Sequence, residues 1–336
     1  MPSADHLTPA AASEARAEEL ASRLSSTSAV KRRMLVIVNP YATTVSDRLR
    51  NLVVYALAAR YDVEAVDTER REHATQICRE AAREGYDLVV AFGGDGTVNE
   101  AANGLLGSDT PLSCLPGGAT NVFHRTIGIP NDVVDATEYL LAMADDFRPR
   151  KVDLGMVNGR AFVFSSGVGL DASVVERVDA HPRLKARLGP YYYSWAGLST
   201  FNRRYLVKPP RMNVTVGGET VSAVTMIAQN SDPFTYFGPR PIRVCEGAGL
   251  ETGSLGVAVL RRATPLELPT LIPRLFSGRA ETVSRHRQIT PFRDIGQALV
   301  ESADGRPLPV QVDGDYIGEE DVVRFSSAPR ALTVVT

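Results

Sequence analysis

Runs of consecutive apolar residues alternate with helix-like stretches between residues 33 and 118 of the chain. A continuous apolar run predicts a strand covered on both faces, whereas apolar residues repeating every three or four positions predict a helix with one buried face. Strands and helices alternating at this pace are typical of a parallel sheet with helices on both sides. The expected strands are 34–38, 63–66, 87–92 and 112–115, and the expected helices lie around 49–57, 74–81 and 98–105.

The pattern changes after Pro149, where strand-like segments separated by Gly, Pro and Asp turns dominate. Such segments predict a mostly antiparallel β domain. The fold class is therefore expected to be α/β, with an N-terminal parallel-sheet domain and a C-terminal, mostly antiparallel β domain. The strands expected in the second domain are 161–164, 212–216, 221–229, 255–260, 299–302 and 310–312.

Three ranges describe the expected domain organisation. Residues 1–30 are rich in Ala, Ser and Glu with almost no large apolar side chains, which predicts a disordered tail with at most a frayed helix from 11 to 24. Residues 31–148 form the α/β domain and 149–319 the β-rich domain. The last segment, 320–336, is available to complete the first domain, but the sequence does not decide this.

Composition narrows the classes of function. The 336 residues carry a net charge of -2, which gives no overall attraction to nucleic acid. The three cysteines are far apart and form no CxxC or Cys/His cluster, so a reduced, cytosolic setting is expected, without a zinc site. No run approaches the roughly 18 apolar residues needed to span a bilayer.

Three polar loops follow expected strands, at 39–44, 93–97 and 117–121. Ligands of parallel sheets bind beyond the carboxyl ends of the strands, so these loops are expected to converge at one edge. Glycines before a helix N-terminus are typical of a phosphate site, although a tight turn with Asp95 or Thr97 as N-cap needs no ligand. A carboxylate at Asp95 would repel an oligophosphate unless Mg²⁺ lies nearby, which favours a metal-bound nucleotide.

Other nucleotide-binding classes lack support in this sequence. The loop is neither GxxxxGK[ST] nor GxGxxG, which disfavours a P-loop NTPase and a hydride-transfer Rossmann domain. The HRD and DFG signatures of protein kinases are also missing.

Two long motifs carry a family resemblance. Gly93 to Leu105 reads GGDGTVNEAANGL, and Pro116 begins PGGATNVFHRTIGIP. The sequence from about Arg32 to the C-terminus resembles the diacylglycerol kinase catalytic domain of bacterial lipid kinases, which are related to sphingosine and ceramide kinases. Supporting motifs in the same order are Val38-Asn39-Pro40, the segment from Phe164 to Ala172, and Val312-Asp313-Gly314-Asp315.

The resemblance implies a site for ATP with Mg²⁺ on the first domain, which would then be nucleotide-binding. The loop after the first strand borders the phosphates and nucleoside, the loop 94–100 wraps the phosphates, and 117–121 closes the opposite side. No residue is assigned as a metal ligand. The implied nucleotide-binding residues are Asn39, Thr68, Gly93, Gly94, Asp95, Gly96, Thr97, Asn99, Glu100, Gly118, Thr120 and Asn121.

Asp313 matches the acidic residue that family members use as a general base on the lipid hydroxyl. A base must lie about 3 Å from the hydroxyl oxygen it deprotonates. From the residues alone, Asp313-Gly314 after the alternating Val310 and Val312 predicts a type I′ hairpin turn instead. The sequence therefore leaves two interpretations of Asp313, a general base and a residue of a hairpin turn.

The segment 180–218 combines cations with aromatic residues and contains no acidic residue. Tyr191-Tyr192-Tyr193 and Trp195 beside arginines and lysines suit a membrane interface. The alternative is that the aromatic residues pack on the β domain while the cations form a solvated face. Nucleic-acid binding is disfavoured because no recognised module accompanies the cations.

The expected function is an ATP-dependent lipid kinase acting in the cytoplasm, peripherally at the inner face of the membrane. Mg·ATP would lie on the first domain, the lipid would enter from the second, and diacylglycerol would become phosphatidic acid. A homodimer is left open. The alternatives are a kinase of a soluble acceptor, similar to NAD kinase, and a catalytically silent lipid or nucleotide sensor. Val122 and Thr252, which depart from the family motifs, support the sensor.

Overall fold

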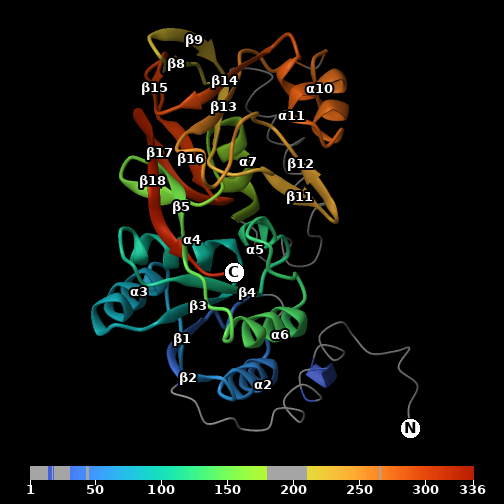
Figure 1. The fold of residues 1–336 in the computed structure, drawn as a ribbon. Coiled ribbons are helices and arrows are strands. Elements are labelled where there is room, and N and C mark those ends of the chain that lie inside the picture. The colour runs from blue at the N-terminus through green and yellow to red at the C-terminus, as the bar shows by residue number, and fades with distance from the viewer. Residues whose placement is uncertain (1–13, 17, 19–30, 43–44, 180–209, 265) are drawn as a thin grey trace, which may run out of the picture. The chain divides into compact units, whose positions relative to one another are not determined.

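The computed structural model describes residues 14–16, 18, 31–42, 45–179, 210–264 and 266–336, drawn in colour in Figure 1. The chain divides into two compact units. Unit 1 comprises Met1–Lys151 with Leu332–Thr336, and unit 2 comprises Val152–Ala331. Most of the expected tail helix and most of the basic aromatic segment lie outside the described residues; residues 14–16 and 18 of the tail are described and are helical.

A parallel sheet forms the centre of unit 1, with the strand order β2-β1-β3-β4. Val334, near the end of β18, pairs in parallel with Leu112 of β4 and so adds the C-terminal residues to this unit. Figure 1 shows α3 and α4 on one side of the strands and α2 and α6 on the other. The strands are β1 (Arg32–Val38), β2 (Tyr61–Asp67), β3 (Leu88–Gly93), β4 (Leu112–Pro116) and β18 (Val322–Val334).

Local sequence signals account for the helices of unit 1. The Ser46 hydroxyl accepts a hydrogen bond from the Leu49 amide at 3.2 Å and so caps α2. Gly85 ends α3 in the left-handed region, where glycine has no steric penalty. The helices are α2 (Asp47–Leu57), α3 (His73–Glu84), α4 (Asp95–Leu105), α5 (Val122–Thr126) and α6 (Val133–Met143).

Unit 2 consists mainly of antiparallel strands in two sheets that share a hydrophobic core. One sheet has the order β14-β13-β10-β7-β16-β17, and the other combines β18, β15, β8 and β9 with β5 and β6. Val168, Met226 and Phe325 belong to the core between them. The strands are β5 (Arg150–Val157), β6 (Arg160–Phe162), β7 (Ser165–Gly169), β8 (Met212–Val216), β9 (Glu219–Ala223), β10 (Thr225–Gln229), β11 (Thr235–Phe237), β12 (Arg240–Ile242), β13 (Leu255–Leu260), β14 (Ile289–Ile295), β15 (Gln297–Ser302), β16 (Leu308–Val312) and β17 (Asp315–Glu320).

The expected fold class is confirmed, but one predicted strand is wrong. The apolar run 221–229 is two strands separated at Val224: β9 pairs with β8, whereas β10 pairs with β7 and β13. A continuous apolar run cannot reveal a crossing between sheets, because both halves are buried.

Helices within the β domain were also not predicted. They are α7 (Leu170–Asp179), α10 (Leu268–Leu275) and α11 (Ala280–Ser284). Two of them are short, and α10 contains Pro273, so their periodicity is too weak to predict a helix. Within the described residues, no helix is long and apolar enough to cross a membrane.

Candidate active site

Two glycine loops touch each other at the carboxyl ends of β3 and β4. The Gly117 amide donates a hydrogen bond to the Gly93 carbonyl oxygen at 2.9 Å. A Cβ atom on Gly117 would lie 2.8 Å from the Gly93 Cα, and one on Gly118 would lie 2.9 Å from the Gly94 Cα. Only glycine permits backbones to approach this closely, so the loops form one surface of main-chain atoms.

The first loop leads directly into α4. Gly94 is the N-cap residue and provides no side-chain hydrogen bond to the helix. The interpretation of Asp95 or Thr97 as a simple N-cap is therefore wrong, since both lie inside α4. A helix N-terminus directs amide hydrogens and positive dipole outward, an arrangement that suits a phosphate group.

Asn39 ties the end of β1 to this loop. Its amide Nδ2 donates to the Thr97 hydroxyl at 3.2 Å, and its backbone amide donates to the Phe92 carbonyl at 3.0 Å. Thr68 follows β2, and its backbone amide donates to the Val38 carbonyl at 2.8 Å. The structure thus brings Asn39, Thr68 and the loop 93–97 to the same edge of the sheet.

Asn121 organises the second loop. Its backbone adopts the left-handed conformation (φ 49°), and its side chain both accepts from the Gly118 amide at 2.9 Å and donates to the Gly118 carbonyl at 2.8 Å. Asn121 Nδ2 also donates to Asn131 Oδ1 at 2.9 Å, a contact that the sequence did not indicate. Thr120, which precedes Asn121 in the chain, is half-buried.

Asp95 lies where the two loops and two helices meet. Its Oδ1 accepts a hydrogen bond from the Phe123 amide at 3.2 Å, which links α4 to α5. The side chain is half-buried. A carboxylate in this position is suited to contact a divalent cation that accompanies a bound phosphate.

Glu100 and Asn99 make contacts within the α3–α4 pair. The Glu100 carboxylate accepts from the backbone amides of Glu72 at 2.9 Å and Ala74 at 3.2 Å, and thereby holds the start of α3. Asn99 is 2% exposed, and its Oδ1 accepts from Asn103 Nδ2 at 3.3 Å. The structure shows these two residues supporting the helix that carries the glycine loop.

His124 lies fully buried in α5, directly after the second loop. Burial lowers the pKa of its imidazole from 6.5 to about 4, and the nearby Leu115 carbonyl acts in the opposite direction. Neither ring nitrogen reaches a partner with hydrogen-bond geometry. His124 is therefore neutral and acts as a packing residue beneath the loop.

Asp313 belongs to unit 2, where it occupies the turn between β16 and β17. Asp313 and Gly314 both have positive φ, at 49° and 83°, so the hairpin interpretation of this turn is confirmed. The Asp313 carboxylate is 4% exposed. It accepts hydrogen bonds from the backbone amides of Val163, Phe164 and Ser165 at 2.8, 2.9 and 3.0 Å, which favour its charged form.

A second carboxylate lies close to that turn and was not singled out from the sequence. Gln311 accepts from the Gly314 amide at 3.0 Å, and its Nε2 donates to Asp171 Oδ2 at 2.7 Å. Burial raises the pKa of Asp171 from 3.8 to about 6, and the Gln311 hydrogen bond opposes this. Asp171 as a whole is half-buried, but protein atoms surround its carboxyl group. Gln311 thus links the Asp171 carboxyl group to the turn that carries Asp313.

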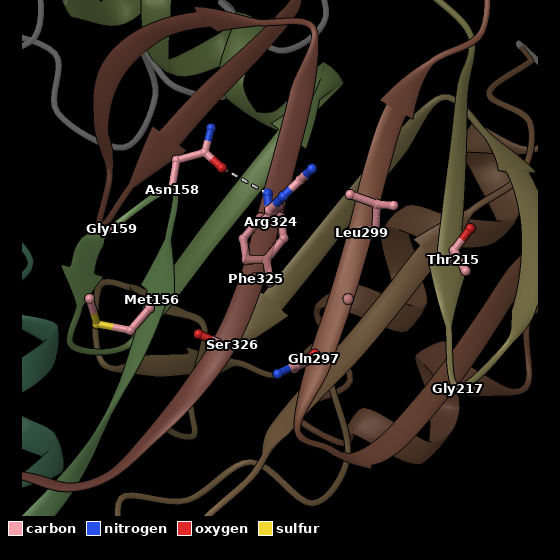
Figure 2. Close-up of a pocket in the computed structure, with 11 residues that line it drawn as sticks. Met156, Asn158, Gly159, Thr215, Gly217, Gln297, Leu299, Arg324, Phe325 and Ser326 are labelled. Carbon is pink, nitrogen blue, oxygen red and sulfur yellow. Dashed lines mark hydrogen bonds between the residues drawn. The ribbon is translucent and has the colours of Figure 1, made fainter.

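A separate hollow of about 720 Å³ lies on the outer face of the sheet containing β18 and β15 (Figure 2). Asn158, in the turn between β5 and β6, is tied to β18 beside the hollow: its Oδ1 accepts from the Arg324 amide at 2.8 Å and its Nδ2 donates to the Val322 carbonyl at 3.1 Å. None of the predicted site residues lines this hollow.

The residues of unit 1 fit a phosphate-bearing ligand better than an isolated metal ion. Among the described residues, no group of three or more His, Cys, Asp or Glu side chains could hold a metal by itself. A Mg²⁺ ion, however, commonly uses one or two carboxylates together with substrate phosphates. The side-chain-free contact between the glycine loops, with Asp95 beside it, matches that requirement.

Comparison with known families covers both units. The profile of the diacylglycerol kinase catalytic domain matches residues 33–157, and that of the YegS C-terminal NAD kinase beta sandwich-like domain matches residues 164–336. A diacylglycerol kinase of Staphylococcus haemolyticus (strain JCSC1435) is 32% identical over 149 residues, which cover 43% of each chain. A diacylglycerol kinase of Staphylococcus aureus (strain JH9) is 31% identical over 170 residues, which cover 49% of this chain and 51% of the relative. The chain thus spans about half the length of the curated relatives it matches.

Solved structures extend the similarity over nearly the whole chain. A candidate diacylglycerol kinase from Bacillus anthracis str. Sterne superposes with a TM-score of 0.70 at 26% identity, covering 93% of this chain and 97% of that one. A second structure from the same organism gives a TM-score of 0.67 at 24% identity and covers 92% and 98% of the two chains. The second similarity shows a shared fold.

Proposed function

Because the chain belongs to the bacterial diacylglycerol kinase family, we propose that it is an ATP-dependent kinase that phosphorylates a lipid hydroxyl. Diacylglycerol is the proposed acceptor and phosphatidic acid the product. The reaction would take place at the cytoplasmic face of a membrane, where ATP and the lipid meet. The observation that carries the proposal is the contact between the loops at Gly93 and Gly117, which leaves room for no side chain.

The proposed phosphate-binding residues come from unit 1. The start of α4 directs its amide hydrogens and dipole toward the triphosphate, and these donors stabilise the negative charge that develops during transfer. A bound Mg²⁺ would supply further neutralisation of the phosphate oxygens. Asp95 would contact that ion, and Asn39 and Asn121 hold the two loops in place through the contacts described above.

Asp313 is the proposed general base. Its role would be to accept the proton of the acceptor hydroxyl as the oxygen attacks the γ-phosphorus. Three backbone amides hold its carboxylate in one orientation and favour its charged form. The same hydrogen bonds make it a weaker base, so the proton transfer would have to accompany bond formation to phosphorus and not precede it.

A second candidate function is phosphorylation of a soluble alcohol. The observation in its favour is the match of residues 164–336 to a domain described as NAD kinase beta sandwich-like. The two functions are distinguished by incubating the full chain with ATP labelled in its γ-phosphate, together with Mg²⁺. The acceptors are diacylglycerol, a sphingoid base and another lipid alcohol, each in mixed micelles, and NAD in solution.

Label in phosphatidic acid supports the proposal, whereas label in NAD alone overturns it. If the chain binds ATP and labels no acceptor, the interpretation as a sensor replaces both kinase functions. Asp313→Asn tests the base: turnover is expected to fall by at least about 100-fold while ATP affinity stays within a few-fold. Glu319→Gln, at an exposed position in the same hairpin, is the matched control. A melting curve is needed for Asp313→Asn, because an amide nitrogen cannot accept from the backbone amides.

A further inference from the structure

The short helix α10 of unit 2 has an apolar face exposed to solvent. Three of the eight large apolar side chains that are exposed in the described part of the chain lie between residues 266 and 276. Leu266 is 82% exposed, Ile272 47% and Phe276 43%. Pro269 and Pro273, at helical spacing from Ile272 and Phe276, are exposed as well.

The opposite face of α10 is fixed to the domain. Leu271 of α10 belongs to a buried cluster with Val283 of α11, Ile242 and Leu260. Leu275 of α10 packs against that cluster. Phe276 contacts the Phe237 ring edge-on, with the ring centroids 5.5 Å apart. The outward position of Ile272 therefore follows from the packing of its neighbours and is not a frayed end.

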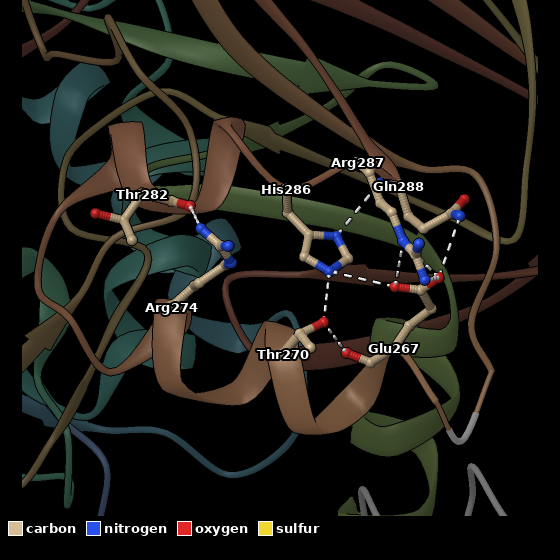
Figure 3. Close-up of polar contacts among 7 residues, drawn as sticks. All are labelled: Glu267, Thr270, Arg274, Thr282, His286, Arg287 and Gln288. Carbon is tan, nitrogen blue, oxygen red and sulfur yellow. Dashed lines mark hydrogen bonds and ion pairs between the residues drawn. The ribbon is translucent and has the colours of Figure 1, made fainter.

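A polar network fixes the start of the helix (Figure 3). The buried Glu267 carboxylate accepts three hydrogen bonds from the Arg287 guanidinium, at 2.7, 3.0 and 3.2 Å, and one from Gln288 Nε2 at 3.3 Å. The Thr270 hydroxyl lies 2.9 Å from His286 Nε2. Arg274 Nη1 donates to the Thr282 carbonyl at 3.2 Å and joins α10 to α11. A helix fixed at both ends presents the same face at all times.

The stretch of chain that carries the apolar face is rich in positive charge. Residues 261–288 contain six arginines and two glutamates, although the whole chain has a net charge of -2. Of the two glutamates, Glu267 is buried against Arg287 and only Glu281 is exposed. Among the described residues, no ion pair is formed by four exposed arginines of this stretch, which are Arg261, Arg262, Arg279 and Arg285.

We propose that this docking face, formed by Leu266, Ile272 and Phe276 with the arginines around them, binds the surface of an anionic phospholipid membrane. The apolar side chains would enter the region between headgroups and acyl chains, and the arginines would contact lipid phosphates. An exposed apolar patch can also mark a protein interface, but excess positive charge favours a lipid surface over a second copy of the same basic patch. The inference deepens the proposed function, on which it rests, by naming the element that holds the enzyme on its substrate's membrane.

The experiment measures binding of the full chain, without nucleotide, to vesicles of phosphatidylcholine with and without phosphatidylglycerol. The double variant Leu266→Ser/Ile272→Ser is expected to bind anionic vesicles at least about tenfold more weakly, because burial of one such side chain is worth a factor of that size. Tyr55→Ser/Tyr139→Ser removes exposed aromatic side chains of unit 1 and is expected to bind like the wild type.

Charge is tested separately. Arg261→Glu/Arg262→Glu is expected to weaken binding to the anionic vesicles, whereas Arg79→Glu/Arg83→Glu on α3 changes the net charge equally and is expected to have a much smaller effect. Unchanged binding of both docking-face variants would overturn the inference. So would a wild-type dimer in size-exclusion chromatography that Leu266→Ser/Ile272→Ser dissociates without losing vesicle binding, because the face would then join two copies of the chain.

Failure of the inference can be separated from failure of the proposed function. With a short-chain diacylglycerol dissolved as monomers, Leu266→Ser/Ile272→Ser is expected to keep wild-type turnover, and to lose it only on vesicles. A protein that binds vesicles through α10 but phosphorylates no lipid would refute the kinase and leave the docking face in place.

Discussion

At the scale of single residues, Asp171 connects local environment to a measurable property. Burial raises the pKa of its carboxyl group from 3.8 to about 6, so the folded protein binds a proton in a range where the unfolded chain has lost it. The stability that this group contributes is complete below pH 3.8 and is lost as the pH rises through about 6. Stability therefore decreases with rising pH across this window.

Replacement of Asp171 by Asn is expected to remove that dependence. The amide oxygen can still accept the hydrogen bond from Gln311, and no charge is desolvated. Well above pH 6 the free energy of unfolding should rise by up to about 3 kcal/mol, and its slope between pH 3.8 and 6 should flatten. Urea denaturation across this pH range measures both, and an unchanged slope would show that Asp171 titrates normally.

Gly117→Ala tests the contact between the two loops. The added Cβ would lie 2.8 Å from the Gly93 Cα, so the backbones must separate at the expense of about 1–3 kcal/mol of stability. Affinity for Mg·ATP is expected to fall by at least about tenfold, because the aligned amides move apart. Calorimetric titration measures the affinity. Gly296→Ala, where no atom lies within 4 Å of the new Cβ, is the control and should bind like the wild type.

Some residues of the site could be singled out from sequence and others could not. Glycines that follow a buried strand and flank a carboxylate are rarely needed for a turn alone, so the sequence was enough to predict a phosphate-binding loop at 93–97. Asn131 could not be found, because its contact with Asn121 depends on a left-handed turn that local sequence does not specify. The engagement of the Asp313 carboxylate by the amides 163–165 is equally invisible, because about 150 residues separate the partners.

At the scale of elements, α3 and α4 pack closely because of one glycine. A Cβ on Gly104 would lie 2.5 Å from both the Cys78 Cβ and the Thr75 carbonyl oxygen. Gly104→Ala is expected to destabilise the protein by about 1–3 kcal/mol despite the better helix propensity of alanine, since a backbone atom cannot move aside.

The measurement for Gly104→Ala is the midpoint of thermal or urea unfolding. Arg83→Ala, on the exposed side of α3, should change stability by no more than about 0.5 kcal/mol. If Gly104→Ala were as stable as the wild type, the helices would have to be further apart than described.

Elements were easier to predict in unit 1 than in unit 2. The strands β1, β3 and β4 are continuous apolar runs that end in polar loops, and their expected limits differ from the observed ones by a few residues. In unit 2, β9 and β10 follow each other with Val224 between them yet join different sheets. Pairing between distant strands decides such a boundary, and the local pattern does not record it.

At the scale of the whole molecule, composition and the order of elements were sufficient to predict the fold class. They were not sufficient for the route of β18, whose last residues pair with β4 although most of the strand belongs to unit 2. Leu332, Val334 and Val335 are fully buried there, which explains why a C-terminal segment completes an N-terminal unit. The family resemblance is confirmed by the two matching domain profiles, which follow each other along the chain.

The central claim is that the glycine loops after β3 and β4 hold Mg·ATP. Hydrogen–deuterium exchange of the full chain, with and without Mg·ATP, tests this directly because it reports which backbone amides become protected. Protection is predicted in peptides covering residues 93–100 and 117–121. Exchange that is unchanged in both loops at saturating nucleotide, or protection found only elsewhere in the chain, would contradict the claim.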